Sequence, residues 1–250
     1  MSQPSAVALN RHPHLAAPPV AGSVRVDLHC HTMWSGDCST TPAELAVAVS
    51  DSALDVVCIT DHGTVNGALA MTDELACRVV IGQEVRTQRG EIIGLFLTGR
   101  IPTGLAPHDV CRRIRDQGGI VYVPHPFDPM RAALDGAVLR ELVDDGLIDA
   151  MEGRNAKTSL EHRNASAVAF AREHGLAIGA GSDAHVPEAL GAAYVEMPNF
   201  SNAGDFLAAL WSGVLAGHHF DEPRPWRARI VPSTSAYDDD DVEPQVRPQR

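Results

Sequence analysis

The feature that most constrains the fold of this chain is a regular alternation between short apolar runs and amphipathic segments. The apolar runs favour strands at Val24–Leu28, Asp55–Thr60, Val79–Gly82, Ile92–Leu97, Gly119–Val123, Leu147–Met151 and Leu176–Gly179, with a candidate eighth at Ala193–Met197. The amphipathic segments favour helices at Pro42–Ser52, Val65–Ala76, Pro107–Gln117, Ala137–Asp145 and Ser159–His174. Almost continuously apolar strands that alternate with helices indicate parallel strands covered by helices.

The number of these units favours a closed (β/α) barrel over a doubly wound sheet. No GxGxxG pattern follows the first predicted strand, which argues against a dinucleotide-binding fold. We expect residues 23–220 to form this barrel domain. The Ala-, Pro- and His-rich residues 1–22 are expected to be a flexible leader, and the acidic, Pro-rich residues 221–250 a flexible tail.

Composition narrows the function. The chain of 250 residues has 32 acidic and 20 basic side chains, so an extended nucleic-acid surface is not expected. It contains no apolar run long enough to span a membrane and no signal-peptide profile. Five cysteines without a CxxC pair are typical of reduced thiols, and we therefore expect a cytoplasmic protein.

Potential metal ligands follow most of the predicted strands directly. In a barrel of parallel strands, these positions lie on the one face that carries active sites. His29 and His31 are two residues apart on an extended chain, so both imidazoles point to the same side. Asp183 and His185 repeat this spacing at another strand end. The remaining candidates at these ends are Asp37, His62, Glu84 and His125.

Mixed imidazole and carboxylate ligands suit Zn²⁺, Mn²⁺ or Fe²⁺ better than Ca²⁺. Five histidines and three acids exceed the four ligands that one tetrahedral ion needs. This surplus predicts more than one divalent ion, with a carboxylate such as Glu84 bridging two of them.

The motifs resemble those of the polymerase and histidinol phosphatase (PHP) superfamily. They are Asp27-Leu28-His29-Cys30-His31, Ser35-Gly36-Asp37, Thr60-Asp61-His62-Gly63, Gly82-Gln83-Glu84, Pro124-His125-Pro126 and Gly181-Ser182-Asp183-Ala184-His185. The resemblance implies a distorted (β/α)7 barrel that hydrolyses phosphate esters with metal-activated water at a di- or trinuclear site. It implies that the first metal is held by His29, His31, Glu84 and Asp183, the second by Glu84 and His125, and the third by Asp37, His62 and His185.

The resemblance leaves parts of the site open. Glu152 is expected to be a further ligand or to support one, whereas His162 is expected to be an ordinary helix-surface residue. Asp61 is expected to orient His62 or a bound water. His12, His14, His218 and His219 are expected to be solvated surface histidines.

The branch associated with the tryptophan operon is most similar, and it includes nucleotide phosphatases and short-RNA exonucleases. The interval Val85–Pro124 has no room for the helical insertion of such members, which argues against oligonucleotide phosphodiesterase activity. The expected enzyme is a phosphatase that acts on a small phosphomonoester, such as a nucleotide, or else a short-oligonucleotide phosphodiesterase. The alternatives are a metal-dependent hydrolase of another ester or an amide, and a non-catalytic binding or regulatory barrel.

A substrate phosphate also needs a positioned cation. The candidates are Lys157, which is the only lysine of the chain, Arg131 and, as a third choice, Arg154. The alternative interpretation is that all three are solvated surface charges.

Overall fold

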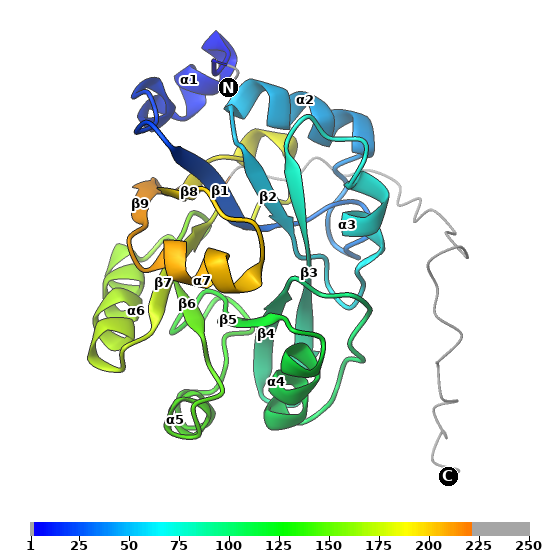
Figure 1. Ribbon diagram of the computed structural model, residues 1–250, viewed down its shortest axis with the longest axis vertical. Helices are drawn as coiled ribbons and strands as arrows, with labels where there is room; N and C mark the ends of the chain where they lie inside the picture. The colour runs from blue at the N-terminus through cyan, green and yellow to red at the C-terminus, as the bar shows by residue number, and fades with distance from the viewer. Residues whose placement is uncertain (1–2, 222–250) are drawn as a thin grey trace.

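The computed structural model describes residues 3–221. Except for Asp221, the expected tail therefore lies outside the described residues. Within them, one nine-stranded sheet has the order β7-β6-β5-β4-β3-β2-β1-β8-β9 (Figure 1). The strands are β1 (Ser23–Cys30), β2 (Val56–Ile59), β3 (Arg78–Thr87), β4 (Gly90–Leu95), β5 (Ile120–Val123), β6 (Ala150–Asn155), β7 (Ala177–Gly181), β8 (Ala193–Pro198) and β9 (Val214–Gly217).

The first seven strands curl into a nearly closed barrel, which confirms the predicted α/β barrel class. β7 and β1 are not paired by a continuous ladder of hydrogen bonds. The barrel closes between them where the chain that follows β7 contacts the end of β1. There the Asp183 amide donates to the His29 carbonyl at 2.7 Å, and Cys30 pairs with Ala184 in a parallel bridge. β8 and β9 extend the sheet on the other side of β1 in antiparallel pairing.

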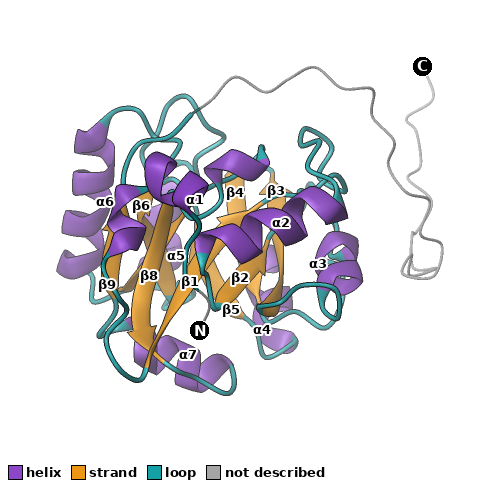
Figure 2. Ribbon diagram, turned by 90° about the horizontal axis from the view of Figure 1, so that it is seen from above, coloured by secondary structure: helices purple, strands orange, loops and turns teal. Residues whose placement is uncertain are grey.

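Helices surround the barrel (Figure 2). They are α1 (Ala6–Arg11), α2 (Pro42–Ser52), α3 (Asn66–Met71), α4 (Pro107–Asp116), α5 (Gly136–Asp144), α6 (Glu161–Glu173) and α7 (Ala203–Leu210), with 3-10 turns at η1 (Pro13–Ala16) and η2 (Pro187–Ala189). The beginning of α2 illustrates how sequence sets these bounds. Thr41 and Glu44 form a reciprocal capping box, and Pro42 occupies the first turn, where its missing N–H costs nothing.

The direction of β4 differs from the expected parallel arrangement. β4 pairs antiparallel with both β3 and β5. The turn between Thr87 and Gly90 is too short for a crossover helix, and a parallel neighbour needs a connection of about a dozen residues or more. Consequently, the beginning of β4 lies at the barrel edge where its neighbours β3 and β5 end.

Three apolar clusters pack the fold. One fills the barrel and is closed by Phe206 of α7, which is fully buried. A second lies between the β4–β6 region and the helices α4, α5 and α6. The third packs α1, α2 and α3 against β1 and β2. Because this packing fixes the strands, their ends form a rigid base for the polar residues above them.

The N-terminal residues differ from the flexible leader that the sequence indicates. Ser5 caps α1, and Leu15 of η1 is almost completely buried. His12 is also buried rather than solvated: its Nδ1 lies 2.9 Å from Nε2 of His218, and its Nε2 lies 2.9 Å from the Glu188 carbonyl. Helices this short have too few residues to produce a visible apolar period. Among residues 3–221, no helix has both the length and the apolar character needed to cross a bilayer.

Candidate metal centre

The first donor cluster joins the ends of three strands. His29 and His31 lie at the end of β1, and their Nε2 atoms are 3.0 Å apart. Glu84 of β3 places Oε2 at 3.4 Å from His29 Nε2 and at 3.3 Å from His31 Nε2. Asp183, just after β7, places Oδ1 at 3.5 Å from His31 Nε2. The structure therefore brings together the four side chains expected around the first metal, all of them buried.

Neighbouring side chains orient both histidines through their second ring nitrogen. His29 Nδ1 lies 3.2 Å from Oε1 of Glu152, and His31 Nδ1 lies 2.9 Å from Oγ of Ser35. With Nδ1 as the donor, each Nε2 keeps its lone pair for a metal. Glu152 thus contacts the His29 imidazole, and it also accepts hydrogen bonds from the His125 amide and from Asn155 Nδ2.

Gly181 allows this close packing. A Cβ atom at Gly181 would lie 2.4 Å from the Cβ of His29 and 2.8 Å from Oε1 of Glu152. Any larger residue would displace His29 or Glu152. This is a physical reason for glycine at the end of β7.

The second cluster contains a residue that sequence reasoning missed. Glu84 Oε1 lies 3.0 Å from His125 Nε2, and Glu91 Oε2 lies 3.7 Å from the same nitrogen. Glu91 Oε1 also lies 3.8 Å from His62 Nδ1, and Glu91 is buried. Glu91 is near the beginning of the antiparallel strand β4. Its side chain therefore lies on the barrel face that carries the donor clusters, although it does not follow the end of a strand. Two features of the sequence could have revealed Glu91. It directly precedes an apolar run, and the turn before it is too short to contain a crossover helix.

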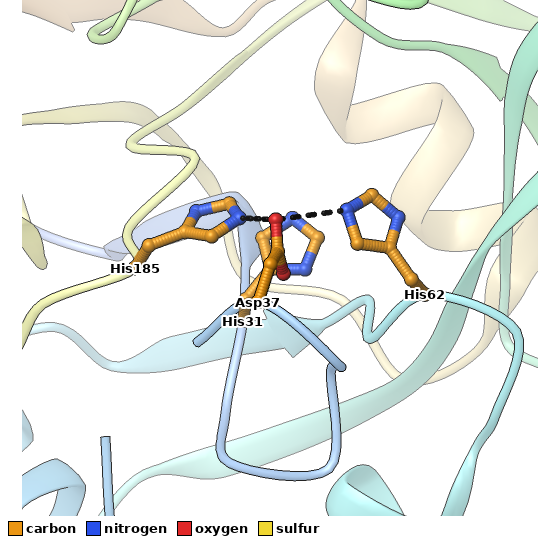
Figure 3. A group of neighbouring side chains, drawn as sticks. All are labelled: His31, Asp37, His62 and His185. Carbon is orange, nitrogen blue, oxygen red and sulfur yellow. Dashed lines mark hydrogen bonds and ion pairs between the residues drawn. The ribbon is translucent and has the colours of Figure 1, made fainter. Parts of the chain in front are cut away.

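The third cluster is more open than the others. Asp37 lies between two imidazoles, with Oδ2 at 3.1 Å from His185 Nε2 and at 3.7 Å from His62 Nε2 (Figure 3). His31 lies behind Asp37 in this view, and ligand atoms of all four side chains fall within 4.8 Å of one another. The Asp37 side chain is 45% exposed and that of His62 is 27% exposed. A ligand or ion at this cluster is therefore accessible from solvent.

The chemistry of these donors fits divalent cations. Imidazole lone pairs and carboxylate oxygens converge within a few ångströms in a largely buried space. Burial, followed by the charge of Glu84, raises the pKa of Glu91. A cation between the two acids would relieve this unfavourable crowding. Nitrogen and oxygen donors in such a mixture suit transition metals such as zinc, manganese or iron.

The Asp61 side chain contacts Thr32, whereas it was expected to orient His62 or a bound water. Its carboxylate accepts hydrogen bonds from Thr32, at 2.7 Å from the amide and at 2.6 Å from Oγ1. A Cβ atom at Gly67 would lie 2.0 Å from this carboxylate, so α3 packs directly on it. Among the hydrogen bonds of the described residues, those of the Asp61 side chain go to Thr32 rather than to His62. Asp61 thus anchors the loop that carries Asp37.

Two of the three candidate cations reach the site. Lys157 Nζ lies 2.9 Å from His185 Nδ1 and 3.6 Å from Asp183 Oδ1, and its side chain is only 6% exposed. Arg131 Nε lies 4.0 Å from Asp183 Oδ2 and is a buried donor without a hydrogen-bond partner among the described residues. Arg154, in contrast, pairs with Glu161 at 2.8 Å. His162 is exposed on α6, as expected.

Known proteins are similar to this chain in sequence or in fold. An uncharacterized protein of Methanocaldococcus jannaschii, MJ1587, is 38% identical over a region that covers 44% of this chain and 72% of that protein. A two-domain protein of Bacteroides vulgatus that contains a predicted PHP-like metal-dependent phosphoesterase has 17% identity and a TM-score of 0.65, covering 81% of this chain and 67% of the other. An amidohydrolase of Chromobacterium violaceum with bound sulfate and no metal has 18% identity and a TM-score of 0.55, covering 66% of this chain and 89% of the other.

Two family models match the chain over most of the barrel. The PHP-associated C-terminal family matches residues 161–215, which include α6, β7, β8 and α7. The PHP domain family matches residues 27–186, an interval that contains all three donor clusters. The chain belongs to the PHP domain family.

Proposed function

We propose that this protein hydrolyses small phosphomonoesters, including nucleotides, at a centre of two to three divalent metal ions. The observation that carries this proposal is the junction of three donor clusters with two side-chain cations. His31 and Glu84 each belong to two clusters, and Lys157 and Arg131 face the neighbouring Asp183. A phosphoryl group placed there would meet positive charge from both sides.

Different residues would hold each ion. His29, His31, Glu84 and Asp183 would hold the first ion, Glu84, Glu91 and His125 the second, and Asp37, His62 and His185 the third. Bound ions of manganese, iron or zinc would supply Lewis acidity and an activated water. Glu152 and Ser35 keep the first two imidazoles in the orientation that metal binding needs.

The cations would recognise the phosphate itself. Lysine acts as a compact point charge, whereas the arginine guanidinium can donate two parallel hydrogen bonds to phosphate oxygens. The buried Nε of Arg131 lies 4.0 Å from Asp183 Oδ2 but makes no hydrogen bond among the described residues. This supports the role, because a buried donor without a hydrogen bond is costly until a ligand accepts from it.

A substrate screen tests the proposal. Protein loaded with Mn²⁺, Fe²⁺ or Zn²⁺ is assayed on phosphomonoesters, short oligonucleotides, carboxyl esters and amides. We expect the highest kcat/KM on a phosphomonoester and its loss on chelation. Hydrolysis of amides or carboxyl esters alone, or of no substrate, would contradict the proposal.

A matched pair of variants connects the activity to the centre. We expect Asp183→Ala to retain less than about a tenth of the activity while it still unfolds cooperatively. Asp73→Ala changes an exposed acid outside the centre and serves as the control. Retained activity in Asp183→Ala would place the reaction elsewhere.

A further inference from the structure

One buried hydrogen bond joins the two loops that carry Arg131 and Lys157. Thr158 Oγ1 donates to Asp128 Oδ2 at 2.8 Å, and the two residues are 2% and 3% exposed. Asp128 belongs to the loop after β5, and Thr158 belongs to the loop after β6. Neither residue is among the donors of the three clusters.

Asp128 organises the loop between His125 and Arg131. Its Oδ1 accepts from the Met130 amide at 2.9 Å, and its carbonyl accepts from the Arg131 amide at 3.2 Å. Phe127, which precedes Asp128, has a φ of 66°, a left-handed conformation that is unfavourable for a bulky residue. The contacts of Asp128 hold this turn and thereby determine where the Arg131 side chain begins.

Thr158 belongs to an equally constrained loop. The amides of Lys157 and Thr158 both donate to Asn155 Oδ1, at 2.9 and 3.2 Å. Asn155 Nδ2 in turn donates to Glu152 and to Asp183, at 2.9 and 3.3 Å. The loop is therefore attached to the base of the metal centre, and the Thr158 hydroxyl extends this network across to Asp128.

The two loops also meet at the cations. Arg131 Nη2 donates to the Lys157 carbonyl at 3.5 Å. This contact is long for a hydrogen bond, so it holds the loops less firmly than the Asp128–Thr158 bond does. The relative position of the two side-chain cations thus depends mainly on the buried bond behind them.

We propose that the Asp128–Thr158 hydrogen bond positions Arg131 and Lys157 as a preformed pair for a phosphate dianion. The proposal rests on the proposed phosphoesterase function. A preformed pair lowers the entropic cost of ordering two long side chains when the anion binds. Asp128 and Thr158 are positioning residues, because they act on the anion only through the cations in front of them.

The test uses Thr158→Val, which keeps the shape of the side chain and removes the hydroxyl, with Thr158→Ser as the matched variant that retains it. We expect Thr158→Val to raise KM for a phosphomonoester at least fivefold while kcat changes less than twofold. The dissociation constant of inorganic phosphate for the metal-loaded protein, measured by calorimetry, should rise in the same proportion. The metal content of Thr158→Val should stay unchanged. Thr158→Ser should have the wild-type KM and the wild-type dissociation constant of phosphate.

The outcomes separate this proposal from the proposed function. An active wild type together with unchanged KM and phosphate affinity in Thr158→Val would overturn the positioning role alone. A fall in kcat or in metal content at constant KM would also overturn it, since the bond would then support the metals. A wild type that neither binds phosphate nor hydrolyses phosphate esters would overturn the proposed function first. Should Thr158→Val not fold, Thr158→Ala provides the same comparison.

Discussion

The Glu84 carboxylate is the side chain on which the donor clusters meet. Its oxygens lie 3.3 Å from His31 Nε2, 3.0 Å from His125 Nε2 and 3.2 Å from His62 Nδ1. Burial alone would raise the pKa of Glu84, but the surrounding imidazoles, His29 first, hold it well below its ordinary value. Glu84 is therefore ionised and able to bridge cations, whereas Glu91 touches the centre from one side.

This difference predicts unequal metal losses in two matched variants. Glu84→Gln should lose more than one metal ion per chain, because it removes a charge shared between clusters. Glu91→Gln should lose about one ion, and the exposed control Glu74→Gln none. Elemental analysis after dialysis against chelator-free buffer gives the numbers. Equal metal content in Glu84→Gln and the wild type would rule out a bridging carboxylate.

A second prediction concerns the two cations at Asp183. We expect Arg131→Ala or Lys157→Ala to raise KM or lower kcat/KM for phosphomonoesters at least tenfold, roughly 1.4 kcal/mol in transition-state binding. Arg154→Ala, which removes a surface partner of Glu161, should leave the kinetics unchanged. Steady-state kinetics with metal analysis of each variant decides the point. Wild-type values in both site variants would mean that the metals alone hold the anion.

At the scale of elements, the sequence predicts best where local signals are strong. The capping box and first-turn proline of α2 give bounds that agree with the expected Pro42–Ser52. The apolar runs locate seven barrel strands, and the motifs at their ends locate eight of the donors. Apolar runs do not show strand direction, so the antiparallel direction of β4 and the candidate ligand Glu91 were missed. α1 and β9 were also missed. α1 is too short to have a visible apolar period, and β9 is partly exposed and so lacks a clear apolar pattern.

The docking of α1 and η1 predicts a pH-dependent stability. Burial, followed by the positive charges of His218, His14 and Arg11, lowers the pKa of His12 to about 4, although the Glu188 carbonyl opposes the shift. In the unfolded chain the ordinary value is 6.5. Above pH 6.5 His12 is neutral in both states, but as the pH falls from 6.5 towards 4 the unfolded state takes up the proton first. This contribution to stability is therefore lost over that window.

His12→Gln isolates the effect, because glutamine does not titrate. Between pH 7 and pH 5 we expect the melting temperature of the wild type to fall by about 2–4 °C more than that of the variant, which corresponds to about 1 kcal/mol in a domain of this size. Thermal melting by circular dichroism at both pH values measures the difference. Parallel pH profiles for the two proteins would show that folding leaves the pKa of His12 unchanged, which would contradict this account.

At the scale of the whole molecule, the barrel collects donors from parts of the chain that are far apart in sequence. The clusters take candidate ligands from the end of β1, from within β3, from the residues that follow β2, β5 and β7 and, through Glu91, from the beginning of β4. Bound ions would therefore tie together opposite sides of a sheet whose first and seventh strands meet without a continuous ladder. Metal binding to the native state alone would stabilise the entire fold.

The number of bound metal ions tests this account most directly. Protein purified without chelator and reconstituted with Mn²⁺ is measured by elemental analysis against its absorbance-based concentration. The adjoining groups of potential ligands predict at least two transition-metal ions per chain. One ion or fewer per chain, unchanged by added Mn²⁺, would contradict a multinuclear centre.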